Sequence, residues 1–479
     1  MNNLRPYLFA AMLVCLAGQH ATAASRPNVL FVVVDDLNTE LRCYGNPVVK
    51  TPNMDRLAAR GVRFDRAYCQ YALCNPSRIS FLSGRRPEST GVYVLNTTPR
   101  DAMPEAVMLP QLFRQKGYFS AGAGKVYHSL KTSDPQSWDF YQDGESEDEQ
   151  ETAAIKSRYG GGGSGGDGTP RGYVLDGDGS RTRDGVNARK IAAYISEHTQ
   201  SGKSFFLAVG FHKPHLPWTA PRRFFDLYPA GSIPEPKAPP LRNIPEVALQ
   251  TELTGFAQPE SRTAAIAAYY ACISFTDDNL GLLLDKLDSH KLWDSTVVIL
   301  VGDNGFHLGD HNGLWAKHTV FEQAARVPLI IAGAGVPQGK TVLQPVELVD
   351  IYPTLAELCG LPAPSGLEGK SLVPWMKGDR KLPPARAYSM IYHYDVATGA
   401  DILGRSIRTL FYRYTEWANG RQDRELYLPK SDPDEYDNQV GSTTVKGQRA
   451  EGQKGLRELK MPKPGPANRP RALVKQKEN

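Results

Sequence analysis

The sequence is poor in cysteine, and after its first 24 residues it has no long apolar run and no internal repeat. Six cysteines among 479 residues exclude a small disulfide-dense domain. The 44 glycines and 36 prolines follow no Gly-X-Y period, which excludes a collagen-like fibre. The hydrophobic fraction of 41% is too high for a wholly disordered chain. The length therefore predicts one large domain with a smaller partner.

The N-terminus has the layout of a secretory signal peptide over residues 1–24. A single charge, Arg5, precedes an apolar stretch from Tyr7 to Gly18, and Ala21-Thr22-Ala23 forms an A-x-A cleavage site. The apolar stretch is too short to span a bilayer, which favours export over a membrane anchor. We therefore expect an exported protein, periplasmic or secreted, with no stable membrane span.

The formal charge of +5 is unevenly distributed along the chain. Residues 441–479 contain ten lysines and arginines against three glutamates, so this tail carries +7. The signal peptide adds +1, which leaves about −3 for residues 25–440. The tail has few aromatic or β-branched residues, a composition typical of a solvated, disordered segment. The alternative is contact with an anionic glycan or surface, and we expect no nucleic-acid partner.

Short apolar runs that end in polar residues predict the buried strands of a mostly parallel sheet. They are Asn28–Val34, Tyr118–Ala121, Phe205–Val209 and Val297–Val301. Helices are expected in between, at residues 52–60, 184–199 and 262–288. The sequence thus predicts an α/β domain over residues 25–385, with the polar clusters gathered at the carboxyl ends of the strands.

From residue 386 the pattern changes to short alternating segments, typical of antiparallel strands. These are Ala387–Tyr394, Arg405–Tyr414 and Glu425–Leu428, with a turn around Gly420. We expect a small C-terminal antiparallel sheet over residues 386–440. The Gly-rich stretch at 160–168, inside an insert at 143–183, lacks the lysine and flanking elements of a phosphate loop and is expected to be a flexible surface loop.

Two pairs of polar residues follow predicted strands. Asp35 and Asp36 follow one, and Asp303 and Asn304 follow another. Each pair taken alone is typical of a turn or a helix cap. Together they offer three carboxylates and an amide oxygen, a ligand set that suits Ca²⁺ or Mg²⁺ rather than zinc.

The most informative string is Cys74-Asn75-Pro76-Ser77-Arg78, which continues to Gly84-Arg85. The proline near the start of a helix-compatible segment places Cys74 at a helix N-terminus, where backbone N–H groups favour an anion. Arg78, one turn later, can present its guanidinium to the same anion.

This string resembles the signature of the type I sulfatases, in which the cysteine is oxidised after translation to formylglycine. The resemblance extends from Asn28 to about Asn438 and includes the two metal pairs. It implies an alkaline-phosphatase-like α/β fold with a mostly parallel sheet flanked by helices and a small C-terminal antiparallel-sheet subdomain. Two further segments resemble the iduronate-2-sulfatase branch most closely, Gly124–His128 and His212–Pro217.

Position by position, the resemblance implies that one Ca²⁺ is bound by five residues: Asp35, Asp36, Asp303, Asn304 and the modified Cys74. Iduronate-2-sulfatases have His where this chain has Asn304, a change that suits calcium but weakens strict iduronate specificity. The resemblance also implies anion-binding and proton-transfer roles for Arg78, Lys125, His128, His212 and Lys317.

The hydrolysis of a sulfate ester requires charge neutralisation, a nucleophile and proton transfers, and each can be assigned to different residues. Ca²⁺, Arg78, Lys125 and Lys317 would neutralise the negative charge. A hydrated aldehyde offers one hydroxyl to attack sulfur and a second to eliminate sulfate. His212, with help from Lys317, is expected to protonate the departing sugar oxygen, and His128 to act as the base in the elimination.

Several assignments stay open at this level. His215, His307, His311 and His318 are either substrate contacts or supporting residues. The pairing of Cys43, Cys69, Cys272 and Cys359 is undetermined, although Cys69 is expected to be a buried structural neighbour of Cys74.

We expect an exported, calcium-dependent sulfatase that acts on a sulfated carbohydrate and depends on a formylglycine-generating or equivalent maturation enzyme. The alternatives are a phosphodiesterase or phosphonate hydrolase on the same scaffold, and a non-catalytic relative that binds sulfated glycans.

Overall fold

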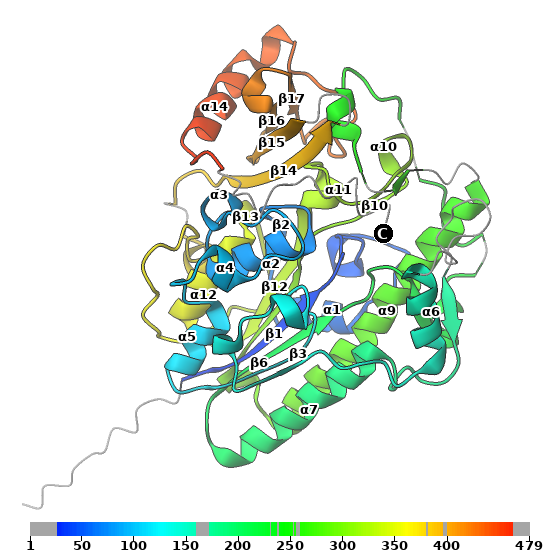
Figure 1. The fold of residues 1–479 in the computed structure, drawn as a ribbon, viewed down its shortest axis with the longest axis vertical. Coiled ribbons are helices and arrows are strands. Elements are labelled where there is room, and N and C mark those ends of the chain that lie inside the picture. Colours follow the sequence, from blue (N-terminus) through cyan, green and yellow to red (C-terminus); the bar gives the residue numbers. More distant parts are fainter. Residues whose placement is uncertain are drawn as a thin grey trace, which may run out of the picture.

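The computed structural model describes residues 26–159, 172–229, 231–236, 239–251, 253–254, 259–379, 382–395 and 400–462. An eight-stranded sheet with the order β13-β2-β12-β9-β1-β6-β3-β4 forms its centre (Figure 1). The predicted signal peptide and the Gly-rich stretch at 160–168 lie outside the described residues. No helix in the described ranges is long and apolar enough to cross a membrane.

Most of the central sheet is parallel, as predicted. Five neighbouring strands run the same way: β9 (Thr296–Gly302), β1 (Asn28–Val34), β6 (Phe205–Phe211), β3 (Phe119–Gly124) and β4 (Phe140–Gln142). On the other side of β9, the strand β12 (Arg326–Gly333) is antiparallel to β9 and to β2 (Gly61–Tyr68), and β13 (Lys340–Glu347) is parallel to β2. The four predicted strands are β1, β3, β6 and β9.

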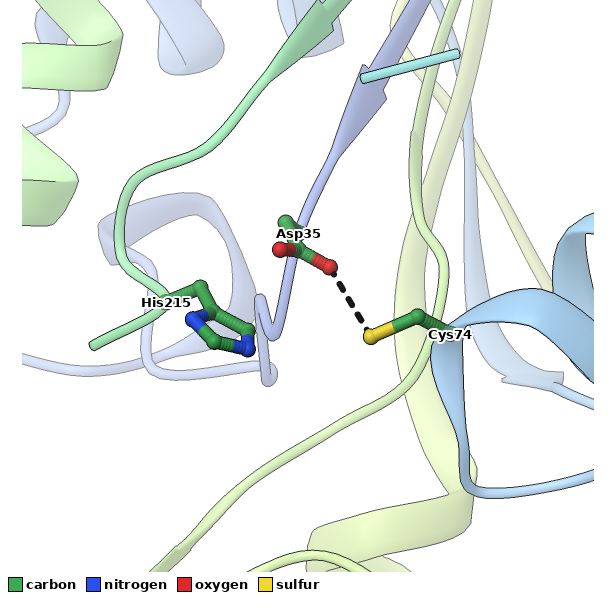
Figure 2. A group of neighbouring side chains, drawn as sticks. All are labelled: Asp35, Cys74 and His215. Carbon is green, nitrogen blue, oxygen red and sulfur yellow. Dashed lines mark hydrogen bonds between the residues drawn. The ribbon is translucent and has the colours of Figure 1, made fainter. Parts of the chain in front are cut away.

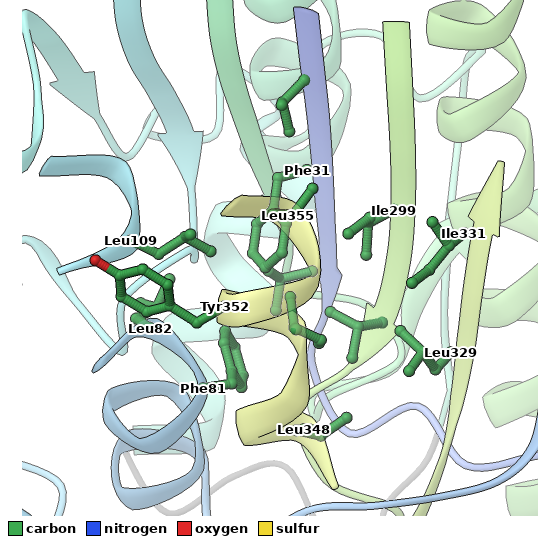
Figure 3. Packing of buried hydrophobic residues seen from close by; sticks show 14 of the residues in the cluster. Phe31, Phe81, Leu82, Leu109, Ile299, Leu329, Ile331, Leu348, Tyr352 and Leu355 are labelled. Atoms are coloured by element: carbon green, nitrogen blue, oxygen red, sulfur yellow. The ribbon is translucent and has the colours of Figure 1, made fainter. Parts of the chain in front are cut away.

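Helices cover both faces of the sheet because its inner strands are apolar on both sides. Val29, Phe31 and Val33 of β1 pack with α2 (Cys74–Ser83), α5 (Leu109–Gln115) and α12 (Ile351–Leu358), and Figure 3 shows this layer around Phe31. The alternate residues of β1 pack on the opposite face with α1 (Pro52–Ala59), α7 (Arg183–Ser201) and α9 (Pro259–Ser289). The three helices predicted from the sequence are α1, α7 and α9. This two-sided burial fixes the strand ends that carry the polar clusters.

Shorter elements occupy the connections. Two of them, α6 (Glu149–Tyr159) and β5 (Tyr173–Leu175), flank the Gly-rich stretch. A hairpin after β9 consists of β10 (His307–Leu308), α10 (Asp310–Gly313) and β11 (Leu314–Ala316), followed by α11 (Glu322–Ala325). The other short elements are α3 (Pro87–Thr90), α4 (Pro99–Ala102), β7 (Thr219–Pro221), α8 (Arg222–Phe225), β8 (Leu253–Thr254) and α13 (Val373–Lys377), with 3-10 turns at Arg42–Tyr44, Leu130–Thr132, Pro135–Ser137, Glu246–Leu249, Trp293–Ser295, Leu348–Asp350, Ala418–Gly420 and Thr443–Val445.

A four-stranded antiparallel sheet follows the main domain, as expected. Its strands are β14 (Ala387–Asp395), β15 (Ala400–Arg408), β16 (Arg413–Trp417) and β17 (Asp423–Tyr427), in that order. The single strand predicted at Arg405–Tyr414 is wrong, because the chain turns between Arg408 and Arg413. The Thr409 hydroxyl accepts the backbone N–H groups of Phe411 and Tyr412, at 3.2 and 3.1 Å, and closes this turn. The turn contains the strand-favouring residues Phe411 and Tyr412 and no glycine or proline that would mark it in the sequence.

The prediction that residues 441–479 form a disordered tail is also wrong in its first part. Residues Lys446–Arg457 form helix α14, which lies against β15 and β16. Leu456 is fully buried with Ile407 and Tyr414. A Cβ at Gly452 would lie 2.6 Å from the Tyr414 ring, so the small residues let the helix approach the sheet. Composition averaged over the tail masked this apolar face, and residues 463–479 lie outside the described residues.

A buried ionic network joins the C-terminal sheet to the main domain. Glu322 of α11 accepts hydrogen bonds from Arg408 Nε at 2.8 Å and from Arg413 Nη2 at 2.6 Å. Arg413 also contacts Glu435 at 2.5 Å, and the hydroxyl of Tyr68 donates to Glu322 at 2.9 Å. Burial alone would raise the pKa of Glu322, but Arg408 and Arg413 hold it well below its ordinary value. Because removing one partner of a buried ion pair leaves an uncompensated charge, this network couples the two sheets strongly.

The docking of α14 gives a direct test of the folded part of the tail. Leu456→Ala is expected to lower the free energy of unfolding by about 2–4 kcal/mol, because it leaves a cavity beside Ile407 and Tyr414. Lys454→Ala, at an exposed position of the same helix, is the matched control and should change stability by less than about 0.5 kcal/mol. Urea titrations followed by tryptophan fluorescence measure both changes. Equal stability of the two variants would contradict the packing of α14.

Candidate active site

The predicted metal residues lie together at the carboxyl ends of two adjacent parallel strands. Asp35 and Asp36 follow β1, Asp303 and Asn304 follow β9, and Val34 pairs with Gly302. The backbone N–H of Asp36 donates to Asp303 Oδ1 at 3.0 Å, and Asn304 Nδ2 donates to Asp36 Oδ1 at 2.7 Å. Asp36 has a positive φ of 57°, which aspartate tolerates better than most residues. The three carboxylates are buried and their oxygens lie within 4.8 Å of one another.

Cys74 is the first residue of helix α2, as expected, and its side chain is directed into this cluster. Its Sγ lies 3.2 Å from Asp35 Oδ1 and 2.9 Å from Lys317 Nζ. Figure 2 shows Cys74 on the far side of Asp35 from His215. Burial, followed by the charge of Asp35, raises the pKa of the Cys74 thiol well above its ordinary value.

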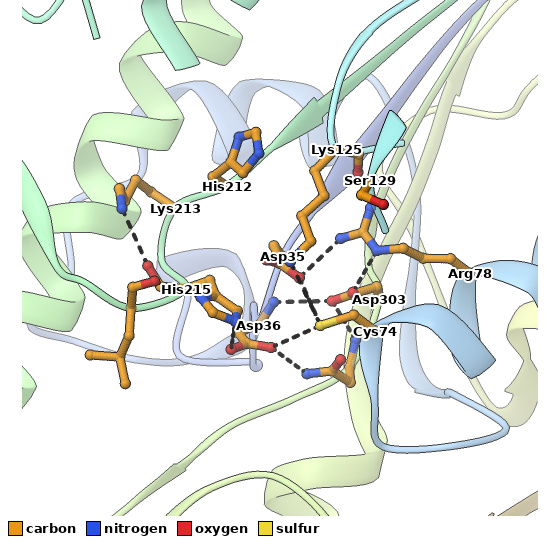
Figure 4. Close-up of polar contacts among 12 residues, drawn as sticks. Asp35, Asp36, Cys74, Arg78, Lys125, Ser129, His212, Lys213, His215 and Asp303 are labelled. Atoms are coloured by element: carbon orange, nitrogen blue, oxygen red, sulfur yellow. Dashed lines mark hydrogen bonds and ion pairs between the residues drawn. The ribbon is translucent and has the colours of Figure 1, made fainter. Parts of the chain in front are cut away.

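Three cations surround the carboxylates, and Figure 4 shows two of them, Arg78 and Lys125, beside Asp35. Arg78 donates from Nε to Asp303 at 2.8 Å and from Nη2 to Asp35 at 3.1 Å. Lys125 forms an ion pair with Asp35, and Lys317 forms one with Asp36. The side chains of all three cations are almost fully buried. The three cations thus place fixed, preorganised positive charge against the three carboxylates.

Lys125 reaches the cluster because β3 and β6 approach closely at their ends. The Lys125 backbone N–H donates to the carbonyl of Gly210 at 2.8 Å. A Cβ at Gly210 would lie 1.9 Å from the Lys125 carbonyl carbon, so only glycine fits there.

The residues at the strand ends fit a hard divalent cation. Three carboxylates and one amide supply oxygen ligands, the set that Ca²⁺ and Mg²⁺ prefer. Asn304 Oδ1 is buried and accepts no hydrogen bond from the described residues. A buried acceptor of this kind needs a partner, and a cation held by Asp35, Asp36 and Asp303 would supply one.

The predicted histidines lie around this cluster in different environments. His128 Nδ1 is buried without a hydrogen-bond partner among the described residues, and burial together with Lys125 lowers the pKa of His128 to about 3. His212 Nδ1 lies 3.0 Å from Asp184, and its Nε2 lies 3.6 Å from Asp143. Burial would lower the pKa of His212, but Asp143 and Asp184 reverse this and raise it. The polar contacts of His212 are thus with these two aspartates rather than with Cys74.

Four further residues contribute to the site, and the sequence assigned a role to none of them. Asp184, in the first turn of α7, accepts the backbone N–H groups of His212 and Lys213. Lys213 Nζ donates to the carbonyl of Pro217 at 2.6 Å and shapes the loop that carries both histidines. Asp143 directly follows β4, a short strand that the sequence analysis did not predict. His215, left open before, lies with its Nε2 3.7 Å from Asp36 Oδ2.

The other cysteines lie outside the cluster around Asp35 and form no disulfide among the described residues. Cys69 is fully buried, and its Sγ lies 3.8 Å from the carbonyl of Ala324, in agreement with the expected structural role. Cys43, Cys69, Cys74, Cys272 and Cys359 are all free thiols in the described part of the chain.

Comparison with known proteins agrees with this geometry. Residues 27–361 match the family described as Sulfatase, and residues 309–461 match the C-terminal region of N-sulphoglucosamine sulphohydrolase. A sulfatase of Formosa agariphila is 34% identical, with 88% of this chain and 84% of that protein covered. Human iduronate 2-sulfatase is 31% identical, with 88% and 93% covered.

Solved structures share the fold. A protein in complex with its substrate D-glucosamine-2-N,6-O-disulfate superposes with a TM-score of 0.75 at 24% identity, covering 91% of this chain and 97% of that one. A phosphonate monoester hydrolase of Agrobacterium radiobacter gives 0.73 at 22% identity, covering 90% and 95%. With the family match over most of its length, and with iduronate 2-sulfatase among its relatives, this chain belongs to the sulfatase family and is a sulfuric ester hydrolase.

Proposed function

We propose that this protein is an exported, calcium-dependent sulfatase that hydrolyses O-sulfate esters of a sulfated sugar or polysaccharide. The observation that carries the proposal is the position of Cys74, at the start of α2 and in contact with both Asp35 and Lys317. Formylglycine formed from Cys74 would present its oxygen atoms at the same place. The proposed enzyme is iduronate-2-sulfatase-like, and its substrate carries a sulfate ester on a sugar ring.

The charge balance of the site supports an anionic substrate. Three buried cations, Arg78, Lys125 and Lys317, oppose the three carboxylates of Asp35, Asp36 and Asp303. A divalent cation held by these carboxylates and by Asn304 Oδ1 would leave the site with a net positive charge. A sulfate ester carries its negative charge on oxygens that such a field stabilises.

The side chains can then be given separate tasks. Formylglycine formed from Cys74 would, once hydrated, supply one hydroxyl for attack on sulfur and a second for release of sulfate. Arg78, Lys125 and Lys317 bind the sulfate oxygens and stabilise the charge that develops on them. The overall reaction adds water across the ester, and yields the free sugar hydroxyl and sulfate.

Two histidines supply the proton transfers in this proposal. The raised pKa of His212, caused by Asp143 and Asp184 against the effect of burial, favours its protonated form. His212, with help from Lys317, therefore protonates the departing sugar oxygen. Burial and Lys125 keep His128 neutral, so that it can accept a proton during sulfate release.

A sugar sulfate is supported by the relatives that the chain resembles. One is iduronate 2-sulfatase, and another is an N-acetylglucosamine-6-O-sulfatase of Bacteroides thetaiotaomicron that is 26% identical. A phosphodiesterase or phosphonate hydrolase is the second candidate, because phosphonate monoester hydrolases share this fold. A non-catalytic, glycan-binding role fits less well, since Cys74 and Arg78 are both in place.

The location and partners follow from segments outside the site. The signal-like residues 1–24 support export to the periplasm or the medium. Oxidation of Cys74 requires a maturation enzyme as a partner. Lys446, Lys454 and Arg457 are exposed on α14, and together with the basic residues after 462 they support contact of the tail with an anionic glycan or surface.

The choice between ester classes can be tested by kinetics. We expect kcat/KM for an aryl sulfate, such as 4-nitrophenyl sulfate, to exceed that for the matched aryl phosphate diester by at least about 100-fold, since the site is complementary to a sulfate ester. A strong preference for the diester would favour the phosphodiesterase alternative. Removal of sulfate from defined glycosaminoglycan disaccharides, followed by mass spectrometry, would then identify the ring and position.

The nucleophile can be tested by peptide mass spectrometry. In protein from the native host, the peptide spanning Cys74 is expected to contain formylglycine, which is 18 Da lighter than cysteine because sulfur and two hydrogens are replaced by oxygen. Cys74→Ala should reduce kcat by more than about 1,000-fold with little change in Tm, because it removes the reacting atom. Cys69→Ala, at a buried cysteine outside the cluster, is the control that should retain turnover. Only unmodified thiol in the active protein would contradict the mechanism.

Metal binding can be tested by the metal content of the protein and by its thermal stability. We expect about one Ca²⁺ per chain, and a stabilisation of about 2.7 kcal/mol when free Ca²⁺ is 100 times the dissociation constant. Asp303→Asn should abolish both, whereas Asp278→Asn, at an exposed carboxylate, should leave them unchanged. Element analysis and thermal unfolding with Ca²⁺ or Mg²⁺ measure these effects. A full Ca²⁺ response in Asp303→Asn would refute the assigned ligand set.

A further inference from the structure

The backbone around Lys317 adopts an unusual conformation. Ala316 and His318, on either side of Lys317, have positive φ values of 70° and 75°. Residues other than glycine rarely occupy this region, and they stay there only when surrounding contacts hold them. The strained turn places Lys317 Nζ 2.9 Å from Cys74 Sγ. Something in the fold must therefore hold this turn in place.

A buried network of polar side chains in the preceding hairpin meets this requirement. Asp310 Oδ1 lies 2.5 Å from His307 Nδ1 and 2.7 Å from His311 Nδ1. His307 Nε2 lies 2.7 Å from the hydroxyl of Thr319. His307, His311 and Thr319 are buried, and none of the three is part of the cluster around Cys74.

The network brackets Lys317 on both sides. The backbone of His307 pairs with Ala316, which precedes Lys317, and its ring contacts Thr319, two residues after Lys317. The His311 ring stacks between Phe321 and Tyr436, with centroid distances of 4.3 and 4.5 Å. His307 thus holds the chain on both sides of Lys317, through its backbone at Ala316 and through its ring at Thr319.

Both nitrogens of the His307 ring are engaged in the network. Asp310 only accepts, so His307 donates to it from Nδ1. His307 Nε2 forms the second hydrogen bond of the ring with the Thr319 hydroxyl, which can act as donor or acceptor. Loss of that hydroxyl would leave a buried nitrogen without its partner.

We propose that His307, Asp310, His311 and Thr319 are positioning residues that hold the Lys317 turn in register with Cys74. This inference rests on the proposed function, in which Lys317 contacts the sulfate group. None of the four touches the substrate in this arrangement, and they act through Lys317.

The test uses Thr319→Val, which keeps the shape of the side chain but removes the hydroxyl, with Thr319→Ser as the matched control. With an aryl sulfate as substrate, Thr319→Val is expected to lower kcat about 10–100-fold and to change KM by less than about 3-fold, because a displaced lysine stabilises the transition state less well. Thr319→Ser should retain kcat within about 3-fold, because its hydroxyl can still form the hydrogen bond with His307. Tm measurements confirm that each variant is folded, and Asp310→Asn carries the same expectation if Thr319→Val is not recovered.

A double-mutant cycle shows whether the effect passes through Lys317. In a Lys317→Met background, Thr319→Val should lower the residual kcat by less than about 3-fold, because the lysine that it displaces is gone. Wild-type kcat in Thr319→Val, or an equal loss in both backgrounds, would overturn the positioning role. Wild-type kcat in Lys317→Met alone would instead contradict the sulfate-binding role of Lys317, and the positioning role with it.

Discussion

The carboxylate of Asp35 contacts several groups of the site, and the positions of these groups depend on it. It contacts Cys74 of α2, Arg78 one turn further along that helix, and Lys125 at the end of β3. Arg78 and Lys125 come from separate segments, and their positive charges would repel each other without it. Asp35 is fixed because β1, which it follows, is buried on both faces and paired on both edges. The apolar core thus determines where the charges can lie.

The C-terminal sheet and the segment after it hold the part of the chain that carries Lys317. Glu322, five residues after Lys317, is held by Arg408 and Arg413 of β15 and β16. Tyr436 of the segment after β17 stacks on His311, in the hairpin that leads to Lys317. The small sheet therefore supports one wall of the active site, although none of its described residues belongs to the cluster around Cys74.

Much of the site could be predicted from the sequence because its parts are short and local. Asp35, Asp36, Asp303 and Asn304 each follow an apolar strand, and parallel strands bring such ends together. The roles of Asp143, Asp184 and the His307–Asp310 pair could not be read in the same way, since they depend on contacts between distant segments. Helix α14 was missed because charged residues dominate the composition of the tail. The helix itself contains only two apolar residues and a few glycines. The turn at Thr409 was missed because it contains strand-favouring aromatic residues and neither glycine nor proline.

The pairing of β1 has a consequence for how the protein folds. Its two neighbours, β6 and β9, come from residues 205–211 and 296–302, so both edges of β1 are completed by late segments of the chain. Such a topology has high contact order, and folding must close long loops before the contacts that repay their entropy can form. Asp35 and Asp303 become neighbours only at that stage. The active site is therefore a property of the complete sheet, and no N-terminal fragment that ends before β9 can contain it.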